Sequence, residues 1–181
     1  MIKEALIFAQ EKHKTQTRKS SKLPYMIHIY DVARILTNNH APEHVIVAGI
    51  LHDTLEDTNT TESEIEILFG LKVKEIVLSE TENKELCWKE RKQERIDHLK
   101  NASFDCKMVK CADMLANLCD LRENLKSDGE SVWKRFKGTR QETKWYYESM
   151  IDTMKELEDY NMYKALKKVF VKVFLTASDK N

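Results

Sequence analysis

The sequence predicts an all-α fold, a single-domain irregular helical bundle. Only four Gly and two Pro occur among 181 residues, so the punctuation typical of strand-and-turn proteins is scarce. Apolar residues recur at three- and four-residue intervals along much of the chain, which is the pattern of amphipathic helices. The length suits one domain with a sizeable core, and no linker or repeat divides it. We therefore expect one domain over residues 1–181.

Helical spacing predicts the elements in order. Ile2, Ala5 and Ala9 share one face of a first helix, which should end near Lys14. Pro42 marks the start of a third, central helix, because proline suits the first helical turn. The expected helices cover residues 2–14, 27–38, 42 onward through the central motif, 61–70, 71–78, 88–102, 104–125, 139–159 and 162–175.

Local signals set several of these boundaries. Thr61 and Glu64 have the spacing of a capping box, which would open a short helix. Gly70 is placed to end that helix as its C-cap. Polar residues 79–87 predict a loop, and Ser-Asp-Gly at 127–129 predicts a break between helices.

Composition restricts the function classes. Lys plus Arg and Asp plus Glu balance at 30 each, which argues against a general nucleic-acid binder. The first residues do not resemble a secretory signal, and no segment approaches the ~20 apolar residues of a membrane span. The cysteines have no CxxC spacing, so we expect reduced thiols in a cytoplasmic protein, with no membrane partner. The sequence leaves a homo-oligomer open. The cysteines are Cys87, Cys106, Cys111 and Cys119.

The most informative stretch runs from Leu51 to Thr58, at the end of a strongly apolar segment. His52 and Asp53 form one dyad there, and Glu56 and Asp57 follow as a second. If the helix continues, His52 and Glu56 share one of its faces. Asp53 and Asp57 then share the neighbouring face. A helix end that emerges into solvent is one explanation, and a metal site is the other, because buried charges are costly unless paired or bound to metal.

Two further candidate ligands favour the metal site. His28 and Asp113 each lie in another apolar segment. Three apolar segments that each carry a metal-capable residue are hard to explain by chance. We therefore predict one divalent cation held by His28, His52, Asp53 and Asp113. Imidazole and carboxylate together suit Mn, Fe, Co or Zn.

The order His…His-Asp…Asp resembles the HD-domain superfamily of metal-dependent phosphohydrolases. The run His-Asp-x-x-Glu-Asp resembles the hydrolase domain of bifunctional alarmone synthetase/hydrolases and, more closely, the small alarmone hydrolases. The resemblance covers about residues 1–160, leaving the C-terminal helix 162–175 outside it. Further matching segments are His13-x-x-Gln16-x-Arg18-Lys19, Pro24-Tyr25-x-Ile27-His28, Phe69-Gly70, Thr81 to Leu86, Glu90-Arg91-Lys92, Lys110 to Leu118 and Trp145-Tyr146-Tyr147.

The resemblance implies Mn²⁺ and removal of the 3′-pyrophosphate from guanosine tetra- or pentaphosphate (ppGpp or pppGpp), giving GDP or GTP plus pyrophosphate. Glu56 and Asp57 are expected to position and deprotonate the attacking water or to protonate the leaving oxygen. Two alternatives stay open. One is an HD-type phosphohydrolase for another nucleotide, such as a nucleoside monophosphate or NADPH. The other is a non-catalytic nucleotide-binding module.

A basic window precedes the candidate ligand His28. It contains no acid, so it is either a solvated loop or a cationic rim for a substrate with several phosphates. Its cations are Lys12, Lys14, Arg18, Lys19 and Lys22.

Four residues are candidates for substrate contact by their match to the family. The resemblance gives Arg18 and Lys19 contacts to base and phosphate, Asn117 a contact to ribose or base, and Tyr146 a place at the nucleotide pocket. The alternatives are a surface or core amide for Asn117 and a core aromatic for Tyr146.

The chain departs from the family pattern at three positions. Ile29 stands where proline usually follows the first ligand, and Asn83 stands where the alarmone hydrolases often have Asp. Asp120 lies near a position that often carries a hydroxyl residue. These departures bear on the substrate more than on the chemistry.

Overall fold

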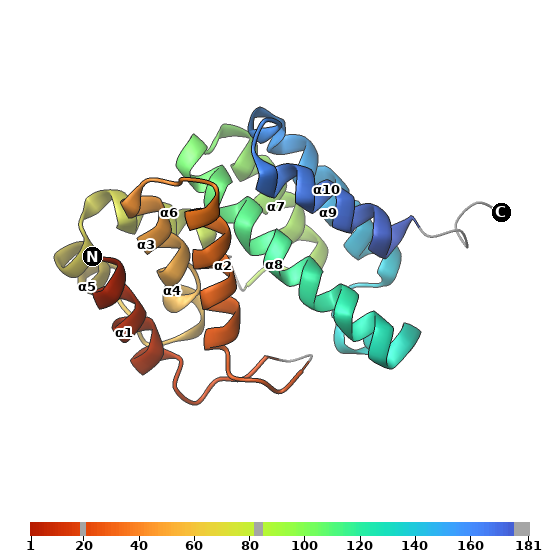
Figure 1. Cartoon of the computed structure of the whole chain (residues 1–181), viewed down its shortest axis with the longest axis horizontal. Coiled ribbons are helices and arrows are strands. Elements are labelled where there is room, and N and C mark those ends of the chain that lie inside the picture. The colour runs from red at the N-terminus through yellow and green to blue at the C-terminus, as the bar shows by residue number, and fades with distance from the viewer. Residues whose placement is uncertain (19–20, 82–84, 176–181) are drawn as a thin grey trace.

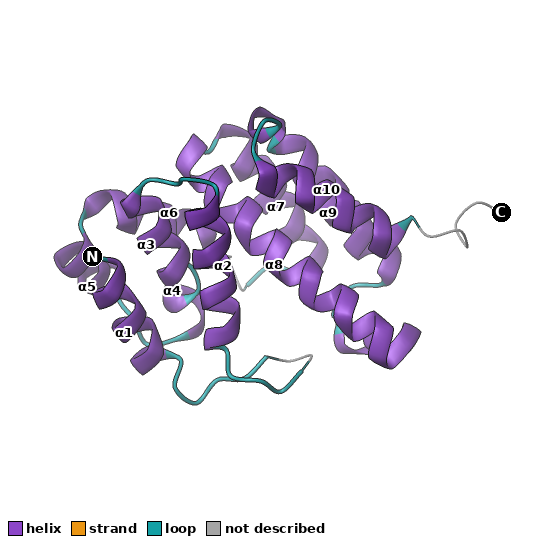
Figure 2. Cartoon of the chain, in the orientation of Figure 1, coloured by secondary structure: helices purple, strands orange, loops and turns teal. Residues whose placement is uncertain are grey.

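The structure, a computed structural model, describes residues 1–18, 21–81 and 85–175, and every regular element of these ranges is a helix (Figures 1 and 2). Thr17 and Pro24 form an isolated antiparallel bridge in the loop before α2. The all-α prediction is confirmed. The helices are α1 (Ile2–Lys12), α2 (Met26–Asn38), α3 (Glu43–Leu51), α4 (Thr54–Asp57), α5 (Glu62–Phe69), α6 (Leu71–Glu80), α7 (Trp88–Asn101), α8 (Phe104–Asp128), α9 (Arg140–Thr153) and α10 (Asn161–Phe174), with 3₁₀ turns η1 (Gly129–Arg135) and η2 (Lys155–Leu157).

Two helices organise the bundle. The short helix α3 packs against α1, α2, α6 and α8, and the long helix α8 packs against α2, α3, α6 and α10 (Figure 1). All residues from Val45 to Leu51 are buried, which is why α3 reads as a nearly continuous apolar run. Because α2, α3 and α8 are mutual neighbours, polar side chains on their facing sides converge inside the protein.

Close packing in this region depends on one glycine. A Cβ added at Gly49 would lie 2.4 Å from Cδ1 of Leu36 in α2. The absence of a side chain at Gly49 lets α2 and α3 approach closely. That approach brings the C-terminal end of α3 next to α2.

Several boundaries follow the sequence signals. Thr61 and Glu64 form the expected capping box at the start of α5, with each side chain bonded to the other residue's backbone N–H. Gly70 ends α5 with φ +88°, a conformation that favours glycine. These two predictions are confirmed.

The expectation of a continuous helix through the central motif is wrong. Regular helix ends at Leu51, and α4 begins at Thr54. The ring Nδ1 of His52 bonds the Gly49 carbonyl, and the Thr54 hydroxyl donates to the Leu51 carbonyl. Side chains thus form hydrogen bonds with backbone carbonyls at the end of the helix in place of backbone N–H groups, and the chain turns at His52 and Asp53.

Two further boundaries differ from the expected ones by three residues or more. Helix α8 extends to Asp128 and ends at Gly129, whose φ is +58°. The break between helices therefore comes at Gly129, the last residue of the segment 127–129 in which it was expected. Helix α9 ends at Thr153, not near residue 159, and a 3₁₀ turn follows. This turn buries Met154 and Leu157 completely, so core packing overrides the continuous helical pattern.

Within residues 1–18, 21–81 and 85–175, no helix is both long enough and apolar enough to cross a lipid bilayer. The cysteines Cys87, Cys106, Cys111 and Cys119 are free thiols. Burial raises the pKa of the Cys111 thiol to about 12, which makes it an inert part of the core.

Candidate metal centre

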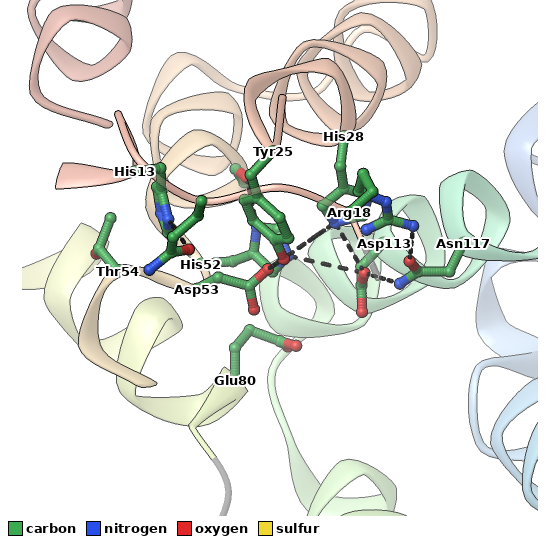
Figure 3. A network of polar contacts seen from close by, with 12 residues as sticks. His13, Arg18, Tyr25, His28, His52, Asp53, Thr54, Glu80, Asp113 and Asn117 are labelled. Carbon is green, nitrogen blue, oxygen red and sulfur yellow. Dashed lines mark hydrogen bonds and ion pairs between the residues drawn. The ribbon is translucent and has the colours of Figure 1, made fainter. Parts of the chain in front are cut away.

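Three apolar segments meet at a cluster of imidazoles and carboxylates (Figure 3). His28 of α2, His52 after α3 and Asp113 of α8 offer ligand atoms that all lie within 4.8 Å of one another. The Nε2 atoms of His28 and His52 are 3.3 Å apart. Asp113 Oδ1 lies 3.3 Å from His28 Nε2 and 3.7 Å from His52 Nε2. Asp53 completes the group, with Oδ2 2.9 Å from His52 Nε2 and 3.9 Å from His28 Nε2.

The donor set of this cluster fits a divalent cation. His28 and His52 are almost fully buried, at 3% and 2% exposure. With Nδ1 of His52 bonded to the Gly49 carbonyl, a neutral ring presents its lone pair on Nε2 toward His28. Two imidazole nitrogens and two carboxylates directed into one small volume suit Mn, Fe, Co or Zn.

Electrostatics point the same way. Burial alone would lower the pKa of His52, but Asp53 and Asp113 outweigh it and hold that pKa well above its usual value. Burial raises the pKa of Asp53, and the charge of His52 outweighs that effect and lowers it. The pKa of Asp113 is likewise lowered, against its burial, by Lys110 and the two histidines. Two ionised carboxylates therefore stabilise positive charge at this position.

Tyr25 belongs to the cluster, although sequence reasoning did not select it. Its hydroxyl donates a hydrogen bond to Asp53 Oδ2, and burial and Asp53 raise the pKa of the phenol, so it stays protonated. Its ring packs 5.6 Å from that of His28 and 5.0 Å from that of His13. The sequence could have pointed to Tyr25, because it lies in the segment Pro24 to His28, which matches the family pattern.

Three buried charged residues beside the cluster were also missed: Glu80, Arg95 and Lys110. Lys110 had a detectable signal, because it is a cation in the apolar run that holds Asp113. No such signal exists in the sequence for Glu80 and Arg95, because they lie on other helices and form their ion pairs with Lys110 and with each other only in the folded chain.

Glu56 and Asp57 lie on α4, directly after Asp53. Glu56 is half-buried and Asp57 is exposed. The Gln16 amide donates to the Asp57 carbonyl at 2.6 Å, and Gln16 Oε1 lies 2.8 Å from Nδ1 of the buried His13. These bonds fix the end of α4 to the loop before α2.

Two of the candidate substrate residues are connected to the cluster. Arg18 Nη2 donates to Asn117 Oδ1 at 2.8 Å and to Asp120 Oδ2 at 3.1 Å. Asn117 Nδ2 in turn donates to Asp113 Oδ1 at 2.5 Å. Figure 3 shows this chain of bonds from Arg18 to the cluster. A cavity of about 40 Å³ adjoins Arg18, His28 and Asp120.

Two lysines of the basic window have acidic partners. Lys12 pairs with Glu64 at 3.1 Å, and Lys14 pairs with Glu11 at 2.6 Å. The window contains no acid, but acids from outside it supply partners. Lys19 lies outside the described residues.

Tyr146 is half-buried on α9, and Lys92 Nζ lies 4.9 Å from the centroid of its ring. Its neighbour Tyr147 packs toward Phe174, with ring centroids 5.9 Å apart. A larger cavity of about 370 Å³ lies between α7 and α9, but no residue of the cluster lines it. Donor chemistry, not cavity size, therefore locates the candidate site.

Comparison with known proteins gives consistent results. The sequence profile of the HD domain family matches residues 5–143. The guanosine-3′,5′-bis(diphosphate) 3′-pyrophosphohydrolase MESH1 of Xenopus tropicalis is 47% identical over 125 residues, which are 67% of this chain and 70% of the relative.

Two solved structures have the same fold. One is a metazoan orthologue of SpoT that hydrolyses ppGpp, with a TM-score of 0.81 and 30% identity, covering 94% of each chain. The other is a protein of Listeria monocytogenes EGD-e, with a TM-score of 0.76 and 35% identity, covering 82% of this chain and 99% of that one.

Proposed function

Because this chain belongs to the HD domain family, we propose that it is a metal-dependent hydrolase of guanosine tetra- and pentaphosphate. It would remove the 3′-pyrophosphate of ppGpp or pppGpp and leave GDP or GTP. The observation that carries the proposal is the convergence of His28, His52, Asp53 and Asp113 from three apolar segments. The substrate follows the MESH1 relative and the structure of the ppGpp-hydrolysing metazoan protein.

His28, His52, Asp53 and Asp113 would hold one divalent cation. Mn²⁺ is our choice, and Fe²⁺, Co²⁺ and Zn²⁺ are compatible with the same donors. When bound, the cation supplies Lewis-acid polarisation of the phosphate and activation of water. The protein's own part begins with orientation. Tyr25 holds the Asp53 carboxylate through Oδ2, and the Gly49 carbonyl holds the His52 ring through Nδ1.

Glu56 and Asp57 would move the protons. Water adds to the phosphorus attached to the ribose 3′-oxygen, and the bond between that phosphorus and that oxygen breaks. The 3′-oxygen gains a proton, the water loses one, and the diphosphate leaves as one unit. A solvent-accessible carboxylate within one helical turn of Asp53 in the sequence is suited to accept the water's proton. Asp57 is the more exposed of the two.

Arg18, Lys19, Asn117 and Tyr146 would contact the nucleotide. Arg18 and Asn117 are supported by the hydrogen bond between them and by the hydrogen bond from Asn117 to Asp113. Tyr146 is supported by a half-buried ring that faces a lysine ammonium. We further expect a cytoplasmic enzyme, consistent with its free thiols, whose partner is a small nucleotide and not nucleic acid or membrane.

The test is a panel of nucleotides incubated with purified, Mn²⁺-loaded protein, with products identified by mass. ppGpp should yield GDP and intact pyrophosphate, not two orthophosphates. The Asp53→Ala protein, prepared in parallel, controls for contaminating phosphatases. If ppGpp is untouched while a nucleoside monophosphate or NADPH is cleaved, the substrate is wrong and the phosphohydrolase chemistry stands. Binding of ppGpp with no turnover of any nucleotide would favour a non-catalytic module.

A further inference from the structure

A buried group of charges adjoins Asp113 on the side away from the histidines. Lys110 Nζ lies 2.6 Å from Glu80 Oε2 and 3.1 Å from Asp113 Oδ2, and Arg95 Nη2 lies 3.2 Å from the same Glu80 oxygen. The Glu80, Arg95 and Lys110 side chains are 1%, 5% and 9% exposed. Figure 3 shows Glu80 beside the cluster.

Stability alone does not explain this group. Taking ions out of water costs several kcal/mol each, and well-packed apolar residues of similar volume often serve a fold as well or better. The group joins the last residue of α6 to α7 and α8. Buried ions in such a position suggest a role for the atoms they contact.

The contacts divide the two oxygens of the Asp113 carboxylate. Oδ2 accepts from Lys110. Oδ1 lies 3.3 Å from His28 Nε2 and accepts from Asn117 Nδ2. Tilting the plane of the carboxylate would lengthen both sets of contacts, so the contacts hold one oxygen at His28 and the other at the Lys110 ammonium.

We propose that Lys110, held in place by Glu80, is a positioning residue that fixes the Asp113 carboxylate so that Oδ1 alone faces the metal. The inference rests on the proposed metal site and names residues that act on it through Asp113. Glu80 acts one step further out, because it contacts Lys110. One-sided ligation by Asp113 leaves a coordination position for water or a phosphate oxygen.

The sign of the metal-affinity change separates positioning from simple electrostatics. A lysine cation next to a ligand repels a divalent metal, so Coulomb's law alone predicts tighter metal binding when Lys110 is lost. Positioning predicts weaker binding. The double variant Glu80→Gln/Lys110→Met keeps the net charge and removes the cation that contacts Asp113 directly, so electrostatics alone does not predict weaker metal binding in it.

The experiment measures Mn²⁺ affinity of chelator-treated protein by following free Mn²⁺ with electron paramagnetic resonance. We expect both Lys110→Met and the double variant to bind Mn²⁺ about 10–100-fold more weakly, the usual cost of losing a residue that orients a ligand. Because Glu80 acts through Lys110, the double variant should bind no more weakly than Lys110→Met. If Lys110→Met does not fold, the Mn²⁺ affinity of the charge-neutral double variant still distinguishes positioning from electrostatics.

The matched control is Lys107→Met. Lys107 lies one turn before Lys110 on α8, is also buried, and pairs with Glu156 at 3.2 Å. Its replacement should lower stability and leave Mn²⁺ affinity unchanged. Wild-type Mn²⁺ affinity in the double variant would overturn the positioning role while leaving the metal site intact. A wild-type protein that binds no Mn²⁺ would overturn both.

Discussion

The metal cluster and the substrate side of the site are built differently. His28 and His52 are almost fully buried, and α2, which carries His28, packs tightly against α3, which His52 directly follows. Arg18 lies in the loop before α2, with 15% of its side chain exposed, and is held by Asn117 and Asp120. The proposed metal cluster is therefore formed in advance, whereas the binding of a nucleotide at Arg18 would have to exchange at least some internal partners.

This difference predicts how the two regions respond to mutation. Removing a group from the cluster leaves buried charges without compensation, which costs several kcal/mol and disrupts the centre. Removing a rim residue exchanges one hydrogen-bond partner for another or for water. Cluster variants should therefore lose metal and turnover, and rim variants should chiefly change KM.

The largest effect is expected for Asp53→Ala. The change removes one carboxylate of the cluster and the acceptor of the Tyr25 hydroxyl, so metal retention and ppGpp hydrolysis should both be lost. Helicity should persist, because Asp53 lies in the turn between α3 and α4. Metal analysis and circular dichroism of one preparation check this. Undiminished metal content would remove Asp53 from the ligand set.

Glu56→Gln should affect chemistry without affecting the metal. We expect kcat to fall by about 10²–10⁴-fold, the typical contribution of a general acid or base. Mn²⁺ content should stay at the wild-type level, since Glu56 is not one of the proposed ligands. Steady-state kinetics with metal analysis test the separation. Near-wild-type turnover, or loss of metal, would place Glu56 in another role.

Metal affinity should depend on pH. The neighbouring carboxylates hold the pKa of His52 above its usual value in the metal-free protein, and a metal binds only the neutral ring. Below that pKa each bound cation displaces one proton, so Mn²⁺ affinity should fall about 10-fold per unit as the pH is lowered. Asp53 and Asp113 do not contribute to the pH dependence of Mn²⁺ affinity near neutrality, because their pKa values are lowered. Titrations at several pH values would contradict this if the affinity were flat.

On the substrate side, Arg18→Ala should raise KM for ppGpp by roughly 10-fold, within the range for a hydrogen bond to a charged group. The effect on kcat should be small. Lys14→Ala is the matched control, because Lys14 lies in the same basic window but is exposed and pairs with Glu11. Equal KM changes in the two variants would indicate a diffuse cationic rim without a specific contact.

The smallest effect, and the one with an unusual sign, is expected for Asp120→Asn. Asp120 shares the Arg18 guanidinium with Asn117 and would compete for it with an anionic substrate. Neutralising Asp120 while keeping its shape should lower KM a few-fold, consistent with the ~1 kcal/mol of a partly exposed ion pair. A raised KM would mean that Asp120 itself helps to bind the nucleotide.

The same contrast shows how far the sequence predicts this protein. The cluster residues could be selected because an ionisable residue in an apolar helical run is a conflict that is visible locally, as at His28 and Asp113. The fold class followed from composition and helical spacing. Glu80 could not be selected, because the partners that make its burial tolerable lie on other helices and meet it only after folding.

Long-range pairing also explains why the partners of the basic window could not be predicted from the sequence. Lys12 pairs with Glu64, 52 residues away, and Arg18 pairs with Asp120. The break at His52 escaped prediction for a different reason. The side chains of His52 and Thr54 compete locally for helix carbonyls, and that competition depends on rotamers that spacing does not specify.

One divalent cation in this cluster should be required for ppGpp hydrolysis. Stepwise addition of Mn²⁺ to metal-free protein tests this requirement, with pyrophosphate release and bound metal measured in the same samples. Turnover should rise in proportion to bound Mn²⁺ and reach its maximum at one ion per chain. Hydrolysis that proceeds in metal-free protein, or that begins only after a second ion binds, would contradict it.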